Sequence, residues 1–249
     1  VSIDALLSEI SDLKENGITL KNKLYINQNC HLILPSHIAL DQARERSLGN
    51  KSIGTTGRGI GPCYEDKVSR KGIRLVDLKN EEIFISKLHN LMEYHNFLLE
   101  KYFNDKLIDI NSVTNDILLK YSKIKSYIYD SEEFINDLCL SGGVVFEGAQ
   151  GTMLDVDHGT FPYVTSSNTT LSGVISGTGV NMSLIKYGLG ITKAYSTRVG
   201  HGPFPSELTT DVGKKIGEIG GEIGATTGRT RRCGWLDLKV LKKSIRLNN

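Results

Sequence analysis

Gly142-Gly-Val-Val-Phe-Glu-Gly-Ala-Gln150 is the segment that most clearly indicates a class of fold. Its compact apolar run, Val144–Phe146, lies between glycines and leads into a polar loop, which is typical of a buried strand. Ile191–Tyr195 has the same character. In sheets built from such strands, ligands bind at the loops beyond the carboxyl ends of the strands. Polar, glycine-rich loops follow both runs, so we expect them to carry the function.

Helical patterns surround these runs. Ser2–Asn16 has an apolar stripe, a serine able to cap its start and Gly17 just past its end. Further helices are predicted at Ser36–Arg46, Leu78–Phe103 with a break near Asn90, Ile110–Tyr121, Ser131–Leu140 and Trp235–Asn249, and short strands at Lys23–Ile26 and His31–Leu34. The alternation predicts an α/β fold with a central, mainly parallel, twisted sheet flanked by helices. We expect residues 1–249 to form the central part of a single domain.

Composition excludes several classes of protein. The 249 residues are 39% hydrophobic and 23% charged, and the formal net charge is only +2, too weak to indicate nucleic acid or a membrane surface as partner. No apolar run is long enough to cross a membrane. The cysteines are scattered without metal-ligand spacing, which favours free thiols in a reducing compartment. They are Cys30, Cys63, Cys139 and Cys233.

The two ends of the sequence are unusual. It begins with Val1 rather than methionine, and it stops inside a helical pattern without a cap. We therefore expect the fold to be truncated at both ends, as a piece of a longer chain.

Ser52–Pro62 is a glycine-rich loop with hydroxyl groups at Thr55 and Thr56 and a guanidinium at Arg58. Its glycines let backbone N–H groups face a bound anion. The loop matches neither a Walker A loop nor a Rossmann fingerprint. A plain turn-rich connection explains its composition equally well.

The segment after this loop, Tyr64–Lys71, is basic. If it is helical, Lys67, Arg70 and Lys71 share one face near the loop. The alternative is a solvated helix face on which acidic neighbours pair with these cations.

The loop after Phe146 carries polar groups suited to catalysis. The Gln150 amide can donate to a carbonyl oxygen as it gains negative charge. Asp155, Asp157 and His158 resemble a hard-metal cluster, but turn chemistry explains them as well. The hydroxyl run Thr165–Thr170 is either a set of phosphate donors or a capping segment.

Gly224–Trp235 concentrates positive charge. Arg229, Arg231 and Arg232 lie close together with no adjacent acidic residue, and crowded cations are stabilised by a bound anion. Otherwise the arginines extend into solvent or onto Trp235. Several anion-binding loops together indicate a phosphorylated substrate and a carboxylate.

Longer motifs resemble one family. Gly59-Ile-Gly-Pro-Cys-Tyr-Glu-Asp-Lys-Val-Ser-Arg70 is similar to the second signature of adenylosuccinate synthetases, Gly-Ile-Gly-Pro-x-Tyr-x-x-Lys-x-x-Arg. Phe146–Thr170 and Gly224–Trp235 also resemble that family, and the similarity runs from about Ser2 to the last residue. It implies GTP-dependent phosphorylation of the 6-oxygen of inosine monophosphate (IMP), with Mg²⁺, followed by displacement of that phosphate by the amine of L-aspartate.

The resemblance also implies residue roles. Thr56 and Thr165 would hold the IMP phosphate, and Gln150 would contact the 6-oxygen of the base. Arg70 would reach the IMP of a neighbouring subunit, which implies a homodimer. Lys67, the signature lysine, would have a supporting electrostatic role in catalysis, as would Gln150.

The arginine-rich loop would receive the aspartate carboxylates. Arg229 would also contact the IMP ribose, and Arg231 the GTP side. Thr230 would contribute only its backbone. The loop residues are Ala225, Thr226, Thr227, Gly228, Arg229, Thr230 and Arg231.

The sequence departs from the family pattern in what it lacks. The amino-terminal phosphate loop Gln-Trp-Gly-Asp-Glu-Gly-Lys-Gly, which carries the catalytic aspartate, the catalytic histidine that follows it, and the Thr-Lys-x-Asp guanine motif are all absent. We therefore expect no metal site in this chain, few GTP contacts and no turnover by these residues alone.

Two rival functions remain. One is a catalytically silent nucleotide-binding or regulatory paralogue, which would bind IMP without forming product. The other is a nucleic-acid-binding domain using the Arg229–Arg232 cluster, with salt-sensitive binding, against which the near-neutral charge argues.

Overall fold

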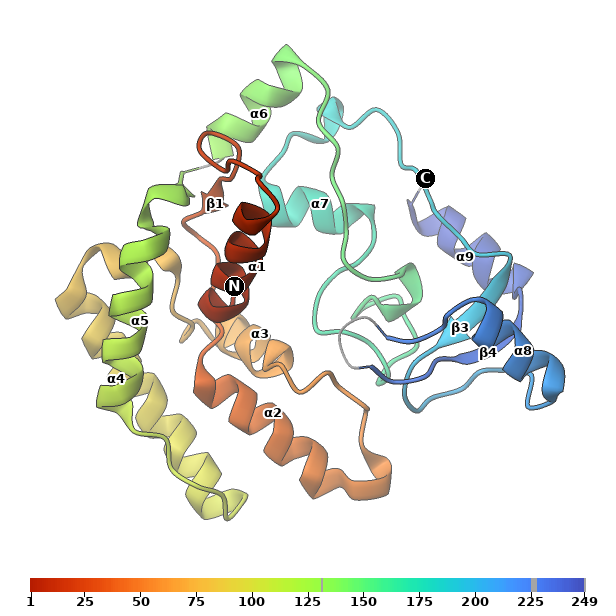
Figure 1. Ribbon diagram of the computed structural model, residues 1–249, viewed down its shortest axis with the longest axis horizontal. Helices are drawn as coiled ribbons and strands as arrows, with labels where there is room; N and C mark the ends of the chain where they lie inside the picture. The colour runs from red at the N-terminus through yellow and green to blue at the C-terminus, as the bar shows by residue number, and fades with distance from the viewer. Residues whose placement is uncertain (131, 225–227, 249) are drawn as a thin grey trace. The chain divides into compact units, whose positions relative to one another are not determined.

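The computed structural model describes residues 1–130, 132–224 and 228–248, and it divides into two compact units (Figure 1). The first unit comprises residues 1–48 and 57–134, and the second comprises residues 49–56 and 135–249. Helices accompany a parallel strand pair in the first unit and an antiparallel pair in the second, so the predicted α/β class is confirmed. That the whole chain forms one domain stays a prediction.

The first unit is mainly helical. Its helices are α1 (Ile3–Glu15), α2 (Pro35–Leu48), α3 (Ile60–Ser69), α4 (Glu81–Phe97) and α5 (Ile110–Ile124). Strands β1 (Ile26–Asn27) and β2 (Ile128–Tyr129) pair in parallel. The predicted strand at Lys23–Ile26 is therefore represented only by its last residue. His31–Leu34 is not a strand, because its antiparallel pairing is a single bridge between His31 and Arg74.

Helix α1 forms where the sequence predicts it. The Ser2 hydroxyl accepts a hydrogen bond from the Ala5 N–H at 3.3 Å, and Gly17 follows the helix with φ +76°. Ile3 and Ile10 are buried, and α1 packs against α5. Capping and amphipathic spacing together fix this element.

The core of the first unit is centred on α4. Phe84, Leu88 and Met92 recur every four residues on one face of that helix, and all three are fully buried. The predicted break near Asn90 is wrong, since α4 continues through that residue. The interruption comes at Asn80, whose side chain accepts from the Ile83 N–H at 3.1 Å and so caps the start of α4.

The second unit contains an antiparallel pair of strands. Strand β3 (Tyr195–Arg198) pairs with β4 (Arg232–Trp235), from Tyr195↔Trp235 to Arg198↔Arg232. The prediction that Trp235 begins a helix is wrong, because it ends β4. The other elements are α6 (Glu132–Ser141), which begins at the boundary of the units, α7 (Leu171–Thr178), α8 (Asp211–Ile219) and α9 (Leu238–Asn248).

Neither of the two apolar runs that suggested buried strands forms one in the described residues. Val145 and Ile191 are each 92% exposed, Val144–Phe146 is not part of a strand in the described ranges, and of Ile191–Tyr195 only Tyr195 is paired, with Trp235. The strand begins at Tyr195, where Ile191–Tyr195 ends. An apolar run becomes a strand only when a neighbouring strand satisfies its backbone groups, and sequence pattern does not supply that neighbour.

Candidate functional site

The arginine-rich segment folds as a short hairpin in the second unit. The Arg231 N–H donates to the Glu222 carbonyl at 2.9 Å, and the Gly224 N–H donates to the Arg229 carbonyl at 2.8 Å. Between these two hydrogen bonds, Ile223 and Thr230 form an antiparallel β-bridge. Gly228 turns the chain with φ +64°. The predicted residues Ala225, Thr226 and Thr227 lie outside the described residues.

Each arginine of this segment has its own partner. The Arg229 Nη1 donates to the Gly54 carbonyl at 3.2 Å, and the Arg231 Nη1 donates to the Glu222 carboxylate at 2.8 Å. Arg232 forms an ion pair with Glu207. Carboxylates from outside the segment therefore compensate two of the charges that the sequence left without an acidic neighbour. Arg232, which is also hydrogen-bonded to the Gly200 and Gly202 carbonyls, is structural.

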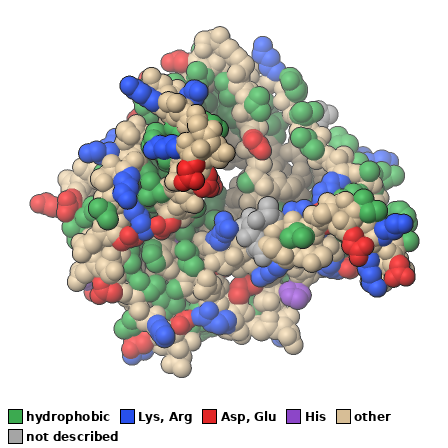
Figure 2. Space-filling view, in the orientation of Figure 1, with side chains coloured by type: hydrophobic (Ala, Val, Ile, Leu, Met, Phe, Trp, Pro, Cys, Tyr) green, Lys and Arg blue, Asp and Glu red, His purple; other side chains and the backbone are tan. Residues whose placement is uncertain are grey.

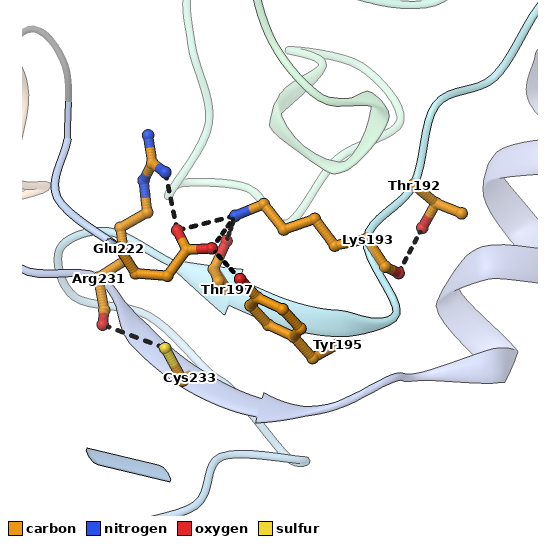
Figure 3. A network of polar contacts seen from close by, with 7 residues as sticks. All are labelled: Thr192, Lys193, Tyr195, Thr197, Glu222, Arg231 and Cys233. Carbon is orange, nitrogen blue, oxygen red and sulfur yellow. Dashed lines mark hydrogen bonds and ion pairs between the residues drawn. The ribbon is translucent and has the colours of Figure 1, made fainter. Parts of the chain in front are cut away.

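Glu222 is the centre of a polar network that sequence reasoning missed (Figure 3). Its carboxylate, 3% exposed, accepts from Lys193 at 2.7 and 2.8 Å, Tyr195 at 2.5 Å and Arg231 at 2.8 Å. Burial alone would raise its pKa, but these donors lower the pKa of Glu222 to about 2. The hydrogen bond to this carboxylate raises the pKa of Tyr195. Gly224 and Gly228 are the sequence signal of a hairpin in which Glu222 opposes Arg231.

The glycine-rich loop reaches this hairpin. Gly54 has φ +83°, and a Cβ placed there would lie 3.4 Å from the Gly200 Cα and 3.6 Å from the Arg229 Nη1. The left-handed backbone conformation favours glycine at this position, while the Cβ distances are those of ordinary contact. The structure therefore brings the segment of Thr56, which is exposed two residues beyond Gly54, to the arginine of the hairpin.

A third segment, residues 146–170, folds around buried Asp155. One carboxylate oxygen accepts from the Asp157 and His158 N–H groups and the other from those of Thr169 and Thr170. Burial opposes ionisation, yet these four donors lower the pKa of Asp155. Turn chemistry, not metal binding, explains the acidic cluster, because its central carboxylate is already fully hydrogen-bonded.

The predicted donors Gln150 and Thr165 belong to this third segment. The Thr165 N–H donates to the Leu154 carbonyl at 2.8 Å, and the Thr169 hydroxyl holds the Gly151 carbonyl at 3.1 Å, next to exposed Gln150. From β3, Arg198 donates to the Thr160 hydroxyl at 3.1 Å. This hydrogen bond therefore links residues 146–170 to β3, the strand that also carries Tyr195 of the Glu222 network.

The signature helix α3 lies in the first unit. Gly59 precedes it with φ +77°, and a Cβ there would lie 2.7 Å from the Ile38 nitrogen, so the signature glycine is sterically required. Exposed Lys67 lies on α3 with its Nζ 5.2 Å from the centre of the Tyr64 ring. Exposed Arg70 ends the helix with φ +65°. The prediction that Lys67, Arg70 and Lys71 share a helix face is wrong, because the helix ends at Ser69.

A buried cluster on α2, α3 and α4 was also missed. The Asp66 carboxylate accepts from the His37 Nε2 at 2.7 Å and the His95 Nε2 at 3.1 Å. Burial alone would raise the pKa of Asp66, but the two histidines lower it. Burial also lowers the pKa of His37. Signals for such a cluster are weak, since its members are far apart in sequence.

This cluster has the spacing of a metal site but not the protonation. The His37 Nδ1 accepts from the Leu34 N–H at 2.9 Å, so in the neutral ring the proton must lie on Nε2. A protonated nitrogen cannot ligate a metal. Asp66 and its histidines therefore do not fit a metal ion, and Asp155 does not fit Mg²⁺.

Surface properties agree with the composition. Figure 2 shows Lys and Arg side chains interspersed with Asp and Glu on the face in view. Among the described residues, no helix has the length and apolar character needed to span a membrane. The cysteines are free thiols, as predicted: Cys30, Cys63, Cys139 and Cys233.

Relatives of this chain share one name. Adenylosuccinate synthetase from Alcanivorax borkumensis is 51% identical over 250 residues, which cover 100% of this chain and 58% of the relative. The Legionella pneumophila protein of that name is 52% identical with the same coverage. The chain thus spans little more than half the length of these relatives.

Solved structures agree. The structure of fully ligated adenylosuccinate synthetase from Plasmodium falciparum is 40% identical, with a TM-score of 0.88, and the match covers 96% of this chain and 56% of that one. A cyanophage succinoaminodeoxyadenylate synthetase, 19% identical with a TM-score of 0.63, shares the fold; that match covers 100% of this chain and 60% of that one. The family model for adenylosuccinate synthetase matches residues 1–249, and the chain therefore belongs to the adenylosuccinate synthetase family.

Proposed function

We propose that the complete protein carrying this sequence is an adenylosuccinate synthase that joins IMP to L-aspartate in purine biosynthesis. GTP transfers its terminal phosphoryl group to the 6-oxygen of IMP, leaving GDP. The aspartate amine then attacks the 6-carbon, inorganic phosphate leaves with the oxygen, and the amine loses a proton to give adenylosuccinate. Phosphorylation converts a poor leaving group into a good one, and the protein supplies orientation and charge.

The contact between Arg229 and Gly54 carries this proposal. It joins the hairpin to the glycine-rich loop within the second unit, which also holds Gln150 and Thr165. In this proposal Thr56 and Thr165 bind the IMP phosphate, and Gln150 contacts the 6-oxygen. Arg229 contacts the ribose.

The hairpin receives aspartate in the same proposal. Residues 225–231 surround the aspartate carboxylates, with Arg229 and Arg231 as the charged donors and Arg231 also facing GTP. A guanidinium fits a carboxylate with two parallel hydrogen bonds, which a lysine cannot offer. Because Arg231 is already held at one nitrogen by Glu222, it reaches the ligand from a fixed position.

The remaining assignments extend the proposal. Lys67 supports catalysis electrostatically, and Arg70 reaches the IMP of a neighbouring subunit in a homodimer. The exposure of Arg70 at the end of α3, beside the 78% exposed side chain of Val68, supports an interface there. One Mg²⁺ binds with GTP through ligands that lie mostly outside this chain, and the protein acts in the cytoplasm.

Product formation tests this function. The complete protein, given IMP, GTP, Mg²⁺ and L-aspartate, should form adenylosuccinate, GDP and phosphate in equal amounts, and omission of any one substrate should abolish the product. IMP binding without product would contradict catalysis and support the silent paralogue. Salt-sensitive binding of RNA or DNA in place of IMP would support the nucleic-acid rival.

A further inference from the structure

We propose that Glu222 is a positioning residue whose buried carboxylate fixes the guanidinium of Arg231 for its contact with aspartate. The inference rests on the proposed function of the hairpin that carries Arg231. Glu222 lies inside the second unit, and its carboxylate contacts side chains of two segments: Tyr195 of β3 with Lys193, two residues before that strand, and Arg231 of the hairpin (Figure 3).

The carboxylate is fully used by these segments. One oxygen accepts from the Lys193 Nζ at 2.7 Å and the Tyr195 hydroxyl at 2.5 Å, and the other accepts from Lys193 at 2.8 Å and the Arg231 Nη1 at 2.8 Å. A carboxylate has about four acceptor positions. Because a donor occupies each of these positions and the side chain is buried, the Glu222 carboxylate has little freedom to reorient.

Arg231 is attached to Glu222 at two points. Its backbone N–H donates to the Glu222 carbonyl at 2.9 Å while its guanidinium donates to the carboxylate at 2.8 Å. Both the main chain and the side chain of Arg231 are thus hydrogen-bonded to Glu222. Holding a guanidinium in advance reduces the conformational entropy that ligand binding must otherwise remove.

The cluster formed by Lys193, Glu222 and Arg231 has a net positive charge. Lys193 and Arg231 bring two positive charges to one carboxylate, so the cluster retains a net charge of about +1. The carboxylate brings the two cations close to each other without neutralising both. A positively charged cluster at the base of the hairpin attracts an anionic ligand such as aspartate.

A second ion pair in the same unit provides the comparison. Glu207 pairs with Arg232, which also donates to the Gly200 and Gly202 carbonyls at 3.3 and 3.0 Å. That arginine is directed at the protein's own backbone and has no assigned ligand. Glu207→Gln therefore removes a carboxylate–arginine pair from the same unit without affecting a proposed ligand contact.

The test is a comparison of Glu222→Gln with Glu207→Gln in the complete protein. Initial rates are measured with aspartate, IMP and GTP varied in turn, together with thermal unfolding. We expect Glu222→Gln to raise the KM for aspartate roughly tenfold to hundredfold, the effect of one misplaced charged hydrogen bond, and to raise the KM for IMP much less. Glu207→Gln should leave the KM for aspartate unchanged.

A purely structural role predicts something else. It would lower the folded fraction, so both variants would lose kcat with each KM unchanged, and that result would overturn the proposal. If Glu222→Gln does not fold, Tyr195→Phe removes one donor to the carboxylate without changing charge, and an unchanged KM for aspartate in that variant would also overturn it. A wild-type protein that forms no adenylosuccinate removes the proposed function and this inference together. An active wild type with unaffected variants removes this inference alone.

Discussion

The Arg229 guanidinium donates to the Gly54 carbonyl at 3.2 Å, although 175 positions of sequence separate the two residues. The contact joins two loops that carry the same tetrapeptide, Thr-Thr-Gly-Arg, beginning at Thr55 and at Thr226. In the proposed function the two loops bind different parts of one nucleotide. Substitutions at Arg229 and Gly54 should therefore distinguish effects on nucleotide binding from effects on folding stability.

Substitution of the arginine tests the binding side. Arg229→Ala should weaken the affinity of the complete protein for IMP by at least about tenfold, because a hydrogen bond from a charged donor is lost. Calorimetric titration with IMP measures this. Arg246→Ala is the matched control, since it removes an exposed arginine of α9 from the same unit. Equal affinities of the two variants would contradict the assignment of Arg229.

Substitution of the glycine tests the geometry. Gly54→Ala forces a side chain into the left-handed region beside the Gly200 Cα, whereas Gly49→Ala has the same backbone strain, at φ +51°, with nothing within 4 Å. Each should lose about 1–2 kcal/mol of unfolding free energy from strain. Only Gly54→Ala should also weaken IMP binding. Denaturant unfolding and IMP titration of the pair separate the two effects, and equal IMP affinities would show that the close approach does not matter.

Acid should destabilise the first unit through the Asp66 cluster. Burial keeps the pKa of His37 below 6.5 in the folded state, so below that pH the unfolded chain binds more protons and stability falls. Although burial opposes it, the histidines keep the pKa of Asp66 below 3.8, so stability falls further as the pH drops below about 4.

Unfolding in urea between pH 7 and pH 3 measures this loss. Asp66→Asn should cost about 3 kcal/mol or more at pH 7, because it removes the charge on which two buried histidines depend. The variant should also lose the part of the pH dependence below pH 4. A stability that stays constant from pH 7 to pH 4 in the wild type would contradict the buried, neutral state of His37.

The tautomer of His37 makes a separate prediction about metals. Because its Nε2 carries a proton, Co²⁺ added to the folded protein should produce no tetrahedral absorption bands from this cluster. Titration followed by visible spectroscopy measures this, with His37→Ala as the reference. Bands that appear in the wild type and vanish in His37→Ala would show that the cluster does bind metal.

Local rules explain what the sequence predicts correctly. Ser2 and Gly17 delimit α1 because capping and left-handed glycine act within a few residues. By contrast, Val144–Phe146 has the composition of a strand, but Val145 is exposed because pairing depends on a distant partner. The Asn80 cap was missed because the helical spacing of apolar residues continues on both sides of Asn80.

The same distinction applies to the candidate site. Motif resemblance identified Arg229 and Arg231, but their partners Gly54 and Glu222 follow from tertiary contacts. Arg232 looked equivalent to its neighbours in sequence, and only its pairing with Glu207 reveals a structural role. Residue type and spacing therefore identify the charged groups, whereas the partners of those groups are set by tertiary contacts.

A crystal structure of the complete protein with IMP would test the proposed nucleotide site most directly. We predict that the IMP phosphate lies within hydrogen-bonding distance of the Thr56 and Thr165 hydroxyls, with Arg229 at the ribose and Gln150 at the 6-oxygen. IMP bound elsewhere, with these four side chains contacting no part of the nucleotide, would contradict the account.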